Sequence, residues 1–422
     1  MAEPIKAMVV DDTITYRMIM KNVAESIPGI RVTGTSSNGK LALDKIVAQF
    51  TANDPERPDI VLLDVEMPVM DGLTTLKELR KRYPKLTVVM VSSTSRQNAN
   101  IIVECLNAGA LDFITKPLEN NVEKAKTTLR QSLEPILTLL QQNQESDKGA
   151  PGAAPPVSPA GATMPPPSQA FSMPSFGARP TLPTPQSRPA AVPMGTRTLP
   201  ATAPAMAPAM APAMAPTRSA ISMKSPPHPD LLLIGSSTGG PAALTTIFST
   251  LREKLPIPTL IVQHMPPVFT TSLAAQLSRA SGLAVKESRD EQPLTPGSVT
   301  IAMGGRHMTL QNRDGGLKLI LNDGPKVNEC RPAVDVLFMS VAASFTGNIL
   351  SVILTGMGRD GTNGVDALKR GGKTWCITQD KSSCVVYGMP RSVEEKGLSD
   401  ESLSLDAIGP RIIQLCNPSL AR

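Results

Sequence analysis

The sequence predicts two α/β domains separated by a long proline-rich segment. Near the N-terminus, short apolar runs rich in β-branched residues alternate with stretches of helical spacing, as expected for βαβ units and a parallel sheet. Residues 141–228 then hold 20 prolines and show no helix or strand period. Ordered patterning resumes at Leu231, so the 422 residues hold two domains rather than three.

The first domain alternates strand-length and helix-length patterns. Its predicted strands are the apolar runs Lys6–Val10, Asp59–Asp64, Thr87–Val91 and Leu111–Thr115. Its predicted helices follow these runs and include Ile14–Ile27, a segment ending near Ala108, and a last helix from about Asn121 to Leu140.

Residues 141–228 are predicted to form a flexible, extended linker. Pro, Ala, Ser and Met dominate this segment, and Ala203–Pro216 repeats Ala-Pro-Ala-Met. A proline at every fourth position is incompatible with both helix and strand, which leaves a polyproline-like chain. We interpret it as a spacer, with a methionine-rich partner surface as the alternative.

The second domain begins at about residue 229 and ends near residue 417. Its predicted strands are the apolar runs at Leu231–Gly235, Thr259–Gln263, Val299–Met303, Leu317–Leu321, Ile349–Thr355 and Thr374–Thr378. Its predicted helices are Gly240–Leu251, Ala333–Phe345 and Gly364–Arg370. Strands alternating with helices again predict an α/β domain.

Charge and composition exclude several classes of protein. The net charge is +6, but the proline-rich segment carries six cations and two anions, so the two domains are close to neutral. A nucleic-acid-binding protein would show a dense basic face. Five scattered Cys and three His predict no zinc site and a reducing compartment. We expect no signal peptide and no membrane insertion, hence a cytoplasmic protein.

Acidic residues end two strands of the first domain. Asp11 and Asp12 follow the first strand, and Asp64 ends a central one. Ligands of open parallel sheets bind beyond the carboxyl ends of strands, and clustered carboxylates favour a hard cation such as Mg²⁺. Lys116 and Ser92 follow two other strands and would add a cation and a hydroxyl to the same pocket.

This ordered set, followed by Pro117, resembles the receiver domain of two-component response regulators over about residues 3–130. The resemblance implies a flavodoxin-like fold with a five-stranded parallel sheet, phosphorylated on an Asp by a histidine kinase. It implies the following roles: Asp64 as phosphoacceptor, Asp11, Asp12, Asp64 and the Glu66 carbonyl as Mg²⁺ ligands, and Ser92, Phe113 and Lys116 as switch residues. Ser93 or Thr94 competes with Ser92 for the switch hydroxyl.

A glycine-rich loop follows the first strand of the second domain. Residues 235–239 (GSSTG) fit the G-x-S-x-G pattern, in a strand–turn–helix context that exposes a nucleophilic serine. The same loop is also compatible with an anion-binding site or with simple helix capping. It lacks the lysine of a P-loop, which disfavours nucleotide binding.

A serine nucleophile needs a base and an orienting acid. His264 ends the Thr259–Gln263 strand, on the sheet edge where Ser237 is expected, so it is the preferred base among three histidines. Asp360, in the glycine-rich segment after Ile349–Thr355, is the preferred acid, and Asp380 competes with it. The chain order Ser, His, Asp differs from that of α/β-hydrolases.

The second domain resembles the catalytic domain of chemotaxis protein-glutamate methylesterases, the CheB family, over about residues 229–417. The matching segments are IGSSTGG, QHMPP, GGRHMTL and LTGMGRDG. The resemblance implies Ser237 as nucleophile, His264 as base, Asp360 as acid, the Met357 N–H as oxyanion donor and an assisting role for Thr238. It also implies a doubly wound α/β fold. Ser236 stands where the family usually has Ala.

The two resemblances together imply a phosphorylation-regulated methylesterase. Its substrates would be glutamate 5-methyl esters on methyl-accepting chemoreceptors, with glutamate and methanol as products and receptor glutamines as further substrates. Its phosphodonor would be the chemotaxis histidine kinase, with Mg²⁺ as the cofactor of phosphorylation and none for the ester chemistry. Inhibition by the unphosphorylated receiver is the hypothesis for regulation. The alternatives are a C-terminal domain that only binds a partner, and a phosphate- or nucleotide-binding domain.

Overall fold

The computed structural model describes residues 3–117, 122–148, 226–251 and 255–417. The predicted linker lies largely outside these residues. The described part forms two α/β domains. No helix among the described residues is long and apolar enough to cross a membrane.

The first domain contains the predicted five-stranded parallel sheet, with strand order β2-β1-β3-β4-β5. Its strands are β1 (Ile5–Val10), β2 (Ile30–Ser36), β3 (Ile60–Asp64), β4 (Thr87–Ser92) and β5 (Asp112–Thr115). Its helices are α1 (Ile14–Glu25), α2 (Gly39–Thr51), α3 (Gly72–Arg82), α4 (Arg96–Asn107) and α5 (Val122–Lys148). The flavodoxin-like fold predicted from the sequence is therefore confirmed.

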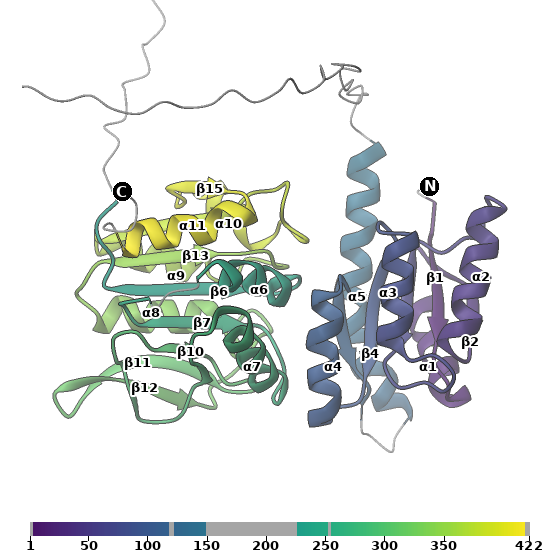
Figure 1. The fold of residues 1–422 in the computed structure, drawn as a ribbon, viewed down its shortest axis with the longest axis horizontal. Helices are drawn as coiled ribbons and strands as arrows, with labels where there is room; N and C mark the ends of the chain where they lie inside the picture. The colour runs from purple at the N-terminus through teal and green to yellow at the C-terminus, as the bar shows by residue number, and fades with distance from the viewer. Residues whose placement is uncertain (1–2, 118–121, 149–225, 252–254, 418–422) are drawn as a thin grey trace, which may run out of the picture. The chain divides into compact units, whose positions relative to one another are not determined.

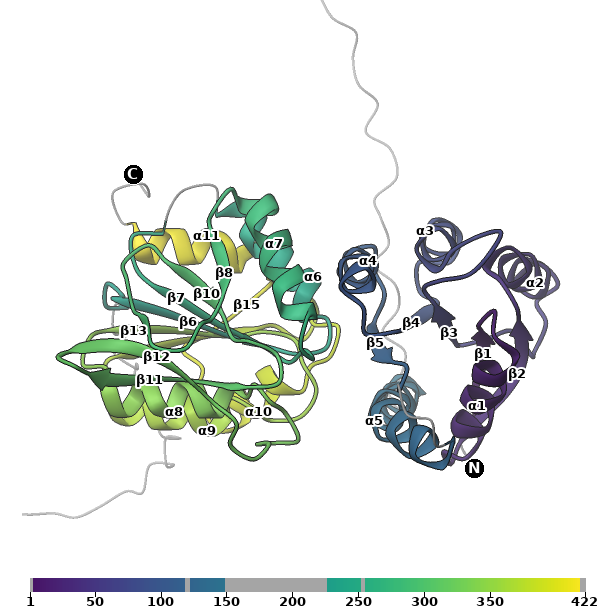
Figure 2. The same ribbon diagram turned by 90° about the horizontal axis from the view of Figure 1, so that it is seen from below.

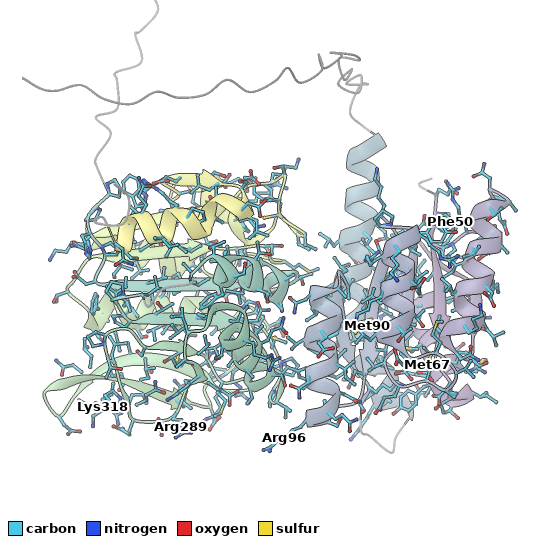
Figure 3. The ribbon with its side chains drawn as sticks, in the orientation of Figure 1. Phe50, Met67, Met90, Arg96, Arg289 and Lys318 are labelled. Atoms are coloured by element: carbon cyan, nitrogen blue, oxygen red, sulfur yellow. The ribbon has the colours of Figure 1, made fainter. Side chains whose placement is uncertain are left out.

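Both faces of this sheet are covered, which explains its nearly continuous apolar strands. Alternate residues point to opposite sides, so Val61 and Leu63 pack toward α2, α3 and α4, while Ile60 and Leu62 pack toward α1 and α5. Figure 2 shows these two helix layers on either side of the sheet. Met90 of β4, labelled in Figure 3, is fully buried.

Helix α5 corrects one predicted boundary. The sequence predicts a helix that ends near Leu140 and a linker that starts at 141, but the helix continues to Lys148. Residues 141–148 contain Gln, Asn, Glu, Ser, Asp and Lys, and no proline occurs until Pro151. Several of these residues have good helix propensity, so nothing ends the helix where its apolar spacing stops.

The second domain is built on a seven-stranded, fully parallel sheet with the order β15-β14-β13-β6-β7-β10-β8. These strands are β6 (Leu231–Ser236), β7 (Thr259–Gln263), β8 (Val285–Glu287), β10 (Val299–Ile301), β13 (Ile349–Ile353), β14 (Thr374–Gln379) and β15 (Glu401–Leu403). A separate antiparallel sheet has the order β11-β12-β9, formed by β9 (Gln292–Pro293), β11 (His307–Arg313) and β12 (Gly316–Asn322).

Helices cover both faces of the seven-stranded sheet, as the doubly wound fold requires (Figures 1 and 2). One layer is formed by α6 (Gly240–Thr250), α7 (Phe269–Ser281) and α11 (Leu405–Cys416), and the other by α8 (Val334–Ser344), α9 (Thr362–Arg370) and α10 (Met389–Glu395). The adjacent central strands β6, β7 and β13 end at the same edge, where the loops after them carry Ser237, His264 and Asp360.

Candidate phosphorylation site and candidate active site

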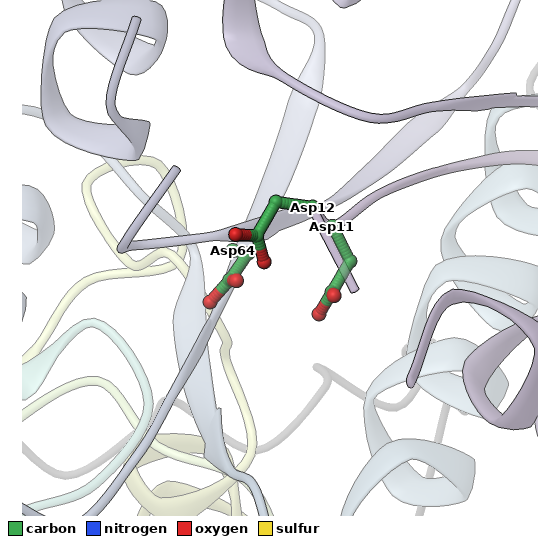
Figure 4. Close-up of side chains that lie close together, drawn as sticks. All are labelled: Asp11, Asp12 and Asp64. Carbon is green, nitrogen blue, oxygen red and sulfur yellow. The ribbon is translucent and has the colours of Figure 1, made fainter. Parts of the chain in front are cut away.

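Three carboxylates gather at the carboxyl ends of β1 and β3. Oxygen atoms of Asp11, Asp12 and Asp64 lie within 4.8 Å of one another. Figure 4 shows the three side chains close together. Asp11 and Asp64 are buried, and Asp12 is exposed. Lys116 Nζ lies 2.7 Å from one oxygen of Asp11 and 2.7 Å from one oxygen of Asp64. The structure thus brings together the four charged residues that the sequence places at strand ends.

The charge balance of this cluster is incomplete. Burial raises the pKa of Asp64 to about 6, Lys116 opposes this rise, and the neighbouring Asp11 carboxylate adds to it. The single positive charge of Lys116 therefore does not balance the negative charge of the carboxylates around it. A divalent cation would supply the missing positive charge.

The donor set fits Mg²⁺. Asp11 Oδ1 accepts a hydrogen bond from the Thr13 N–H at 2.9 Å, and Asp11 Oδ2 is paired with Lys116 Nζ at 2.7 Å. A cavity of about 460 Å³ opens beside the cluster and is lined in part by Asp12 and Glu66. Three clustered carboxylates beside an open cavity are what a hydrated hard cation requires.

The remaining switch residues lie on β4 and β5. Ser92 is fully buried at the end of β4, and its Oγ donates to the Ser93 carbonyl at 3.0 Å. The competing hydroxyl of Ser93 accepts a hydrogen bond from Asn98 Nδ2 on α4 at 2.7 Å. Ser93 Oγ is thus engaged by α4. Phe113 is half-buried on β5.

The two adjacent serines of the second domain have different environments. Ser236 is the last residue of β6, is fully buried, and donates its hydroxyl hydrogen to Gln263 Oε1 at 2.7 Å. Ser237 follows the strand and is only half-buried. Ser237 is therefore the serine that a substrate can reach, which favours it over Ser236 as nucleophile.

Glycines allow the backbone to close around Ser237. Gly239 has a φ of +77°, and a Cβ there would meet Val385 Cβ at 2.6 Å. Gly356 lies so close that its Cβ would be 2.7 Å from Ser237 Cβ. Side chains at either position would push these loops apart.

Two backbone N–H groups near Ser237 are free to stabilise an oxyanion. Among the described residues, no hydrogen bond occupies the N–H of Thr238 or of Met357. The Ser237 N–H, by contrast, donates to the Thr355 carbonyl at 3.0 Å. These two N–H groups are compatible with the oxyanion role that the family resemblance implies for Met357 and with the assisting role that it implies for Thr238.

His264 lies beside this loop because β6 and β7 are neighbours in the sheet. The backbone N–H of His264 donates to the Ser236 carbonyl at 3.1 Å, and the ring Nε2 lies 2.7 Å from Asp360 Oδ2. Burial alone would lower the pKa of His264, but its hydrogen bonds with Asp360 and Cys330 outweigh burial and raise this pKa to about 9. His264 and Asp360 thus form a strongly coupled base–acid pair.

Asp360 is held by more than the imidazole. Its Oδ2 accepts the Val334 N–H at 2.6 Å and its Oδ1 accepts the Asp335 N–H at 3.0 Å, both at the N-terminus of α8. Burial would raise the pKa of Asp360, but the hydrogen bond and charge of His264 and these N–H groups lower it. A carboxylate so held stays ionised, as an orienting acid must.

Both domains match known protein families. The sequence model of the CheB methylesterase family matches residues 232–412, and that of the response regulator receiver domain matches residues 7–127. A protein of Desulfotalea psychrophila, named protein-glutamate methylesterase/protein-glutamine glutaminase, is 35% identical over 97% of this chain and 98% of its own length. A Pseudomonas putida protein of the same name, from a group 1 operon, is 36% identical over 98% and 99%.

The chain belongs to the CheB methylesterase family. Among solved structures, the Thermotoga maritima CheB methylesterase catalytic domain is 43% identical over 44% of this chain and 98% of its own, with a TM-score of 0.43. The response regulator domain of Thermotoga maritima CheB is 31% identical over 32% of this chain and 97% of its own, with a TM-score of 0.27.

Within this CheB methylesterase, the alternative acid Asp380 and the alternative base His307 form hydrogen bonds away from Ser237. Asp380 Oδ1 accepts hydrogen bonds from Ser382 and Ser383, which closes a local turn. His307 is buried at the start of β11, and its Nε2 lies 2.9 Å from the Pro325 carbonyl. These contacts assign both residues structural roles and leave His264 and Asp360 as the pair beside Ser237.

Sequence reasoning missed three residues that contact the candidate triad of this CheB methylesterase. Gln263 Nε2 donates to the carbonyls of Ser237 at 2.9 Å and His264 at 3.2 Å. Cys330 Sγ lies 3.3 Å from His264 Nδ1, and Asn328 Nδ2 donates to Asp360 Oδ1 at 2.9 Å. A polar residue at the end of an apolar strand is a signal for Gln263, but nothing in the local sequence identifies the other two.

Proposed function

We propose that this chain hydrolyses glutamate 5-methyl esters on methyl-accepting chemoreceptors under control of its receiver domain. The observation that carries the proposal is the His264–Asp360 pair, 2.7 Å apart, beside the half-buried Ser237. Two N–H groups nearby have no hydrogen-bond partner among the described residues. Relatives aligned over nearly the whole chain bear the matching name. The cytoplasm, where free thiols persist, is the proposed location.

The proposed reaction has two halves. His264 accepts the Ser237 proton while Ser237 Oγ attacks the ester carbonyl, and the N–H groups of Thr238 and Met357 stabilise the oxyanion. His264 then returns the proton to the methoxide oxygen, so methanol leaves and an acyl-serine remains. Water, deprotonated by His264, then attacks this acyl group. The resulting tetrahedral intermediate collapses, which releases glutamate and regenerates Ser237.

Ser237 Oγ forms no hydrogen bond within the part of the chain that the structure describes. No hydrogen bond joins Ser237 to His264 among the described residues, and the imidazole nitrogen opposite Asp360 faces Cys330. Such contacts are often long in a free enzyme and tighten when substrate binds. We propose that the substrate carbonyl, seated on the two N–H groups, brings Ser237 into reach of His264.

Deamidation is proposed as the second activity, because the curated relatives are named glutaminases as well as methylesterases. A glutamine amide offers the same carbonyl to Ser237, and ammonia takes the place of methanol as leaving group. His264 would protonate the leaving nitrogen.

The receiver is proposed to control the rate through Asp64. The chemotaxis histidine kinase would donate a phosphoryl group to this carboxylate, which lies 2.7 Å from Lys116. Mg²⁺, held by Asp11, Asp12, Asp64 and the Glu66 carbonyl, would balance the phosphoryl charge when bound. Ser92, Phe113 and Lys116 would carry the resulting change to the surface.

The substrate class is tested with membranes that contain methylated chemoreceptors. We expect the intact chain to release methanol from these membranes and ammonia from receptors with glutamine at the same positions. Membranes whose receptors lack both groups are the control. Methanol release equal to that of the control membranes would contradict the proposed substrate.

The pH dependence follows from the pKa of His264. Only the neutral imidazole accepts the Ser237 proton, so a pKa raised to about 9 makes kcat/KM rise with pH through that value. Since Cys330 contributes to the raised pKa of His264, Cys330→Ala is expected to move this rise in kcat/KM to lower pH. A rise in kcat/KM near the ordinary histidine pKa of about 6.5, in both the wild type and Cys330→Ala, would contradict this expectation.

A further inference from the structure

A tight turn contacts both the base and the acid of the proposed triad. Val327 and Cys330 exchange two backbone hydrogen bonds, of 3.1 and 2.9 Å, around Asn328 and Glu329. Both central residues have positive φ, 51° and 61°, which is the pattern of a type I′ turn. Asn is among the residues that adopt this conformation most readily. We call residues 327–330 the 327–330 turn.

Two residues of the 327–330 turn contact different members of the His264–Asp360 pair. Cys330 Sγ lies 3.3 Å from His264 Nδ1, the nitrogen that does not face Asp360. Asn328 Nδ2 lies 2.9 Å from Asp360 Oδ1. A turn closed by two backbone hydrogen bonds holds these two side chains at a fixed separation, so it fixes imidazole and carboxylate relative to each other.

Asn328 also bridges two buried carboxylates. Its amide nitrogen donates to Asp360 Oδ1 and lies 3.2 Å from Asp335 Oδ2. Asp335 in turn accepts the N–H groups of Gly361 at 3.0 Å and Gly364 at 2.7 Å, which begin α9. The Asp360 carboxylate is bound at the start of α8 and the Asp335 carboxylate at the start of α9, with the Asn328 amide between them.

This arrangement needs a neutral donor at position 328. Asp335 and Asp360 are both 2% exposed, so their mutual repulsion is weakly screened by water. Burial raises the pKa of Asp335, and the charge of Asp360 adds to the rise. An amide with two hydrogens satisfies one oxygen of each carboxylate without adding charge.

We propose that Asn328 is a positioning residue for ester hydrolysis, which aligns Asp360, and through it His264, toward Ser237. This inference rests on the proposed function, because it assumes that His264 and Asp360 act on Ser237. Asn328 itself touches no reacting atom.

The test uses two substitutions in the same turn of the intact chain. Asn328→Gly removes the amide but keeps the positive φ available, so the backbone of the turn is preserved. Glu329→Gly is the matched control, because Glu329 is exposed, has positive φ and forms no hydrogen bond or ion pair with the described residues. Both are measured by methanol release at saturating and at limiting substrate, together with thermal unfolding.

We expect Asn328→Gly to lower kcat by about 10- to 100-fold with little change in KM, because misalignment affects the chemical step. Asn328→Asp, which keeps the turn but adds a third carboxylate, is expected to lower kcat at least as far. Glu329→Gly is expected to retain the kcat of the wild type. Equal kcat values for Asn328→Gly and Glu329→Gly, or a rise in KM alone, would overturn the proposal.

Asp360→Asn separates this proposal from the one on which it rests. If Asp360→Asn lowers kcat strongly and Asn328→Gly does not, the triad stands and the positioning role fails. If Asp360→Asn retains full activity, the acid role of Asp360 fails, and the role of Asn328 fails with it.

Discussion

Ser237→Ala is expected to lower kcat for methyl ester hydrolysis by about 10⁴- to 10⁶-fold, because loss of a serine nucleophile removes covalent catalysis altogether. Ser237 is the half-buried serine of the loop after β6, beside the coupled pair His264 and Asp360. The free N–H groups of Thr238 and Met357 would remain, so binding of the ester is expected to change little. Methanol release from methylated receptor membranes measures the effect.

Ser236→Ala is the matched control for this prediction. Ser236 is the adjacent hydroxyl, but it is fully buried and donates to Gln263 Oε1 at 2.7 Å. Its replacement is expected to cost about 1 kcal/mol of stability and to leave kcat within a few-fold of wild type. Loss of activity in Ser236→Ala with retention in Ser237→Ala would exchange the roles of the two serines.

Asp64→Asn is expected to abolish phosphoryl uptake from a small phosphodonor and, with it, any stimulation of methanol release. An amide cannot form the acyl phosphate, and the charge that balances Lys116 at 2.7 Å is lost. Chelation of Mg²⁺ in the wild type is expected to prevent phosphorylation in the same way. Radioactive phosphate incorporation and methanol release are measured on the same samples.

A carboxylate at the other end of β3 provides the control for Asp64→Asn. Asp59 directly precedes β3, at the end opposite the acidic cluster, and its Oδ2 accepts the backbone N–H of Lys6 at 2.8 Å. Asp59→Asn keeps an oxygen acceptor for this N–H, so phosphoryl uptake is expected to persist. Uptake by Asp64→Asn at the wild-type rate would mean that another residue is the phosphoacceptor.

The strands that carry the site could be predicted from sequence because they are buried on both faces. Such strands are short runs of β-branched and aliphatic residues, and their carboxyl ends share one edge of the sheet. The sequence alone therefore predicts Asp64 at a strand end, and Ser237 and His264 on one edge of the second sheet. The structure brings Asp11, Asp12, Asp64 and Lys116 together as that reasoning expects.

Other features depend on contacts that no local pattern encodes. The strand predicted at Leu317–Leu321 exists, but it pairs with β9 and β11 in a separate antiparallel sheet, since an apolar run does not specify its partners. Asp360 and Asp380 both follow buried strands in turn-forming sequences, and only the three-dimensional structure shows which one reaches His264. Asn328 contacts Asp360 across 32 positions of the chain.

The most direct test of phosphorylation-controlled esterase activity is methanol release by the intact wild-type chain from methylated receptor membranes, with and without Mg²⁺ plus a small phosphodonor. We predict release in both conditions and a faster rate with phosphodonor, with both rates abolished in Ser237→Ala. Full activity without phosphodonor would contradict inhibition by the receiver. No release in either condition would contradict the esterase function itself.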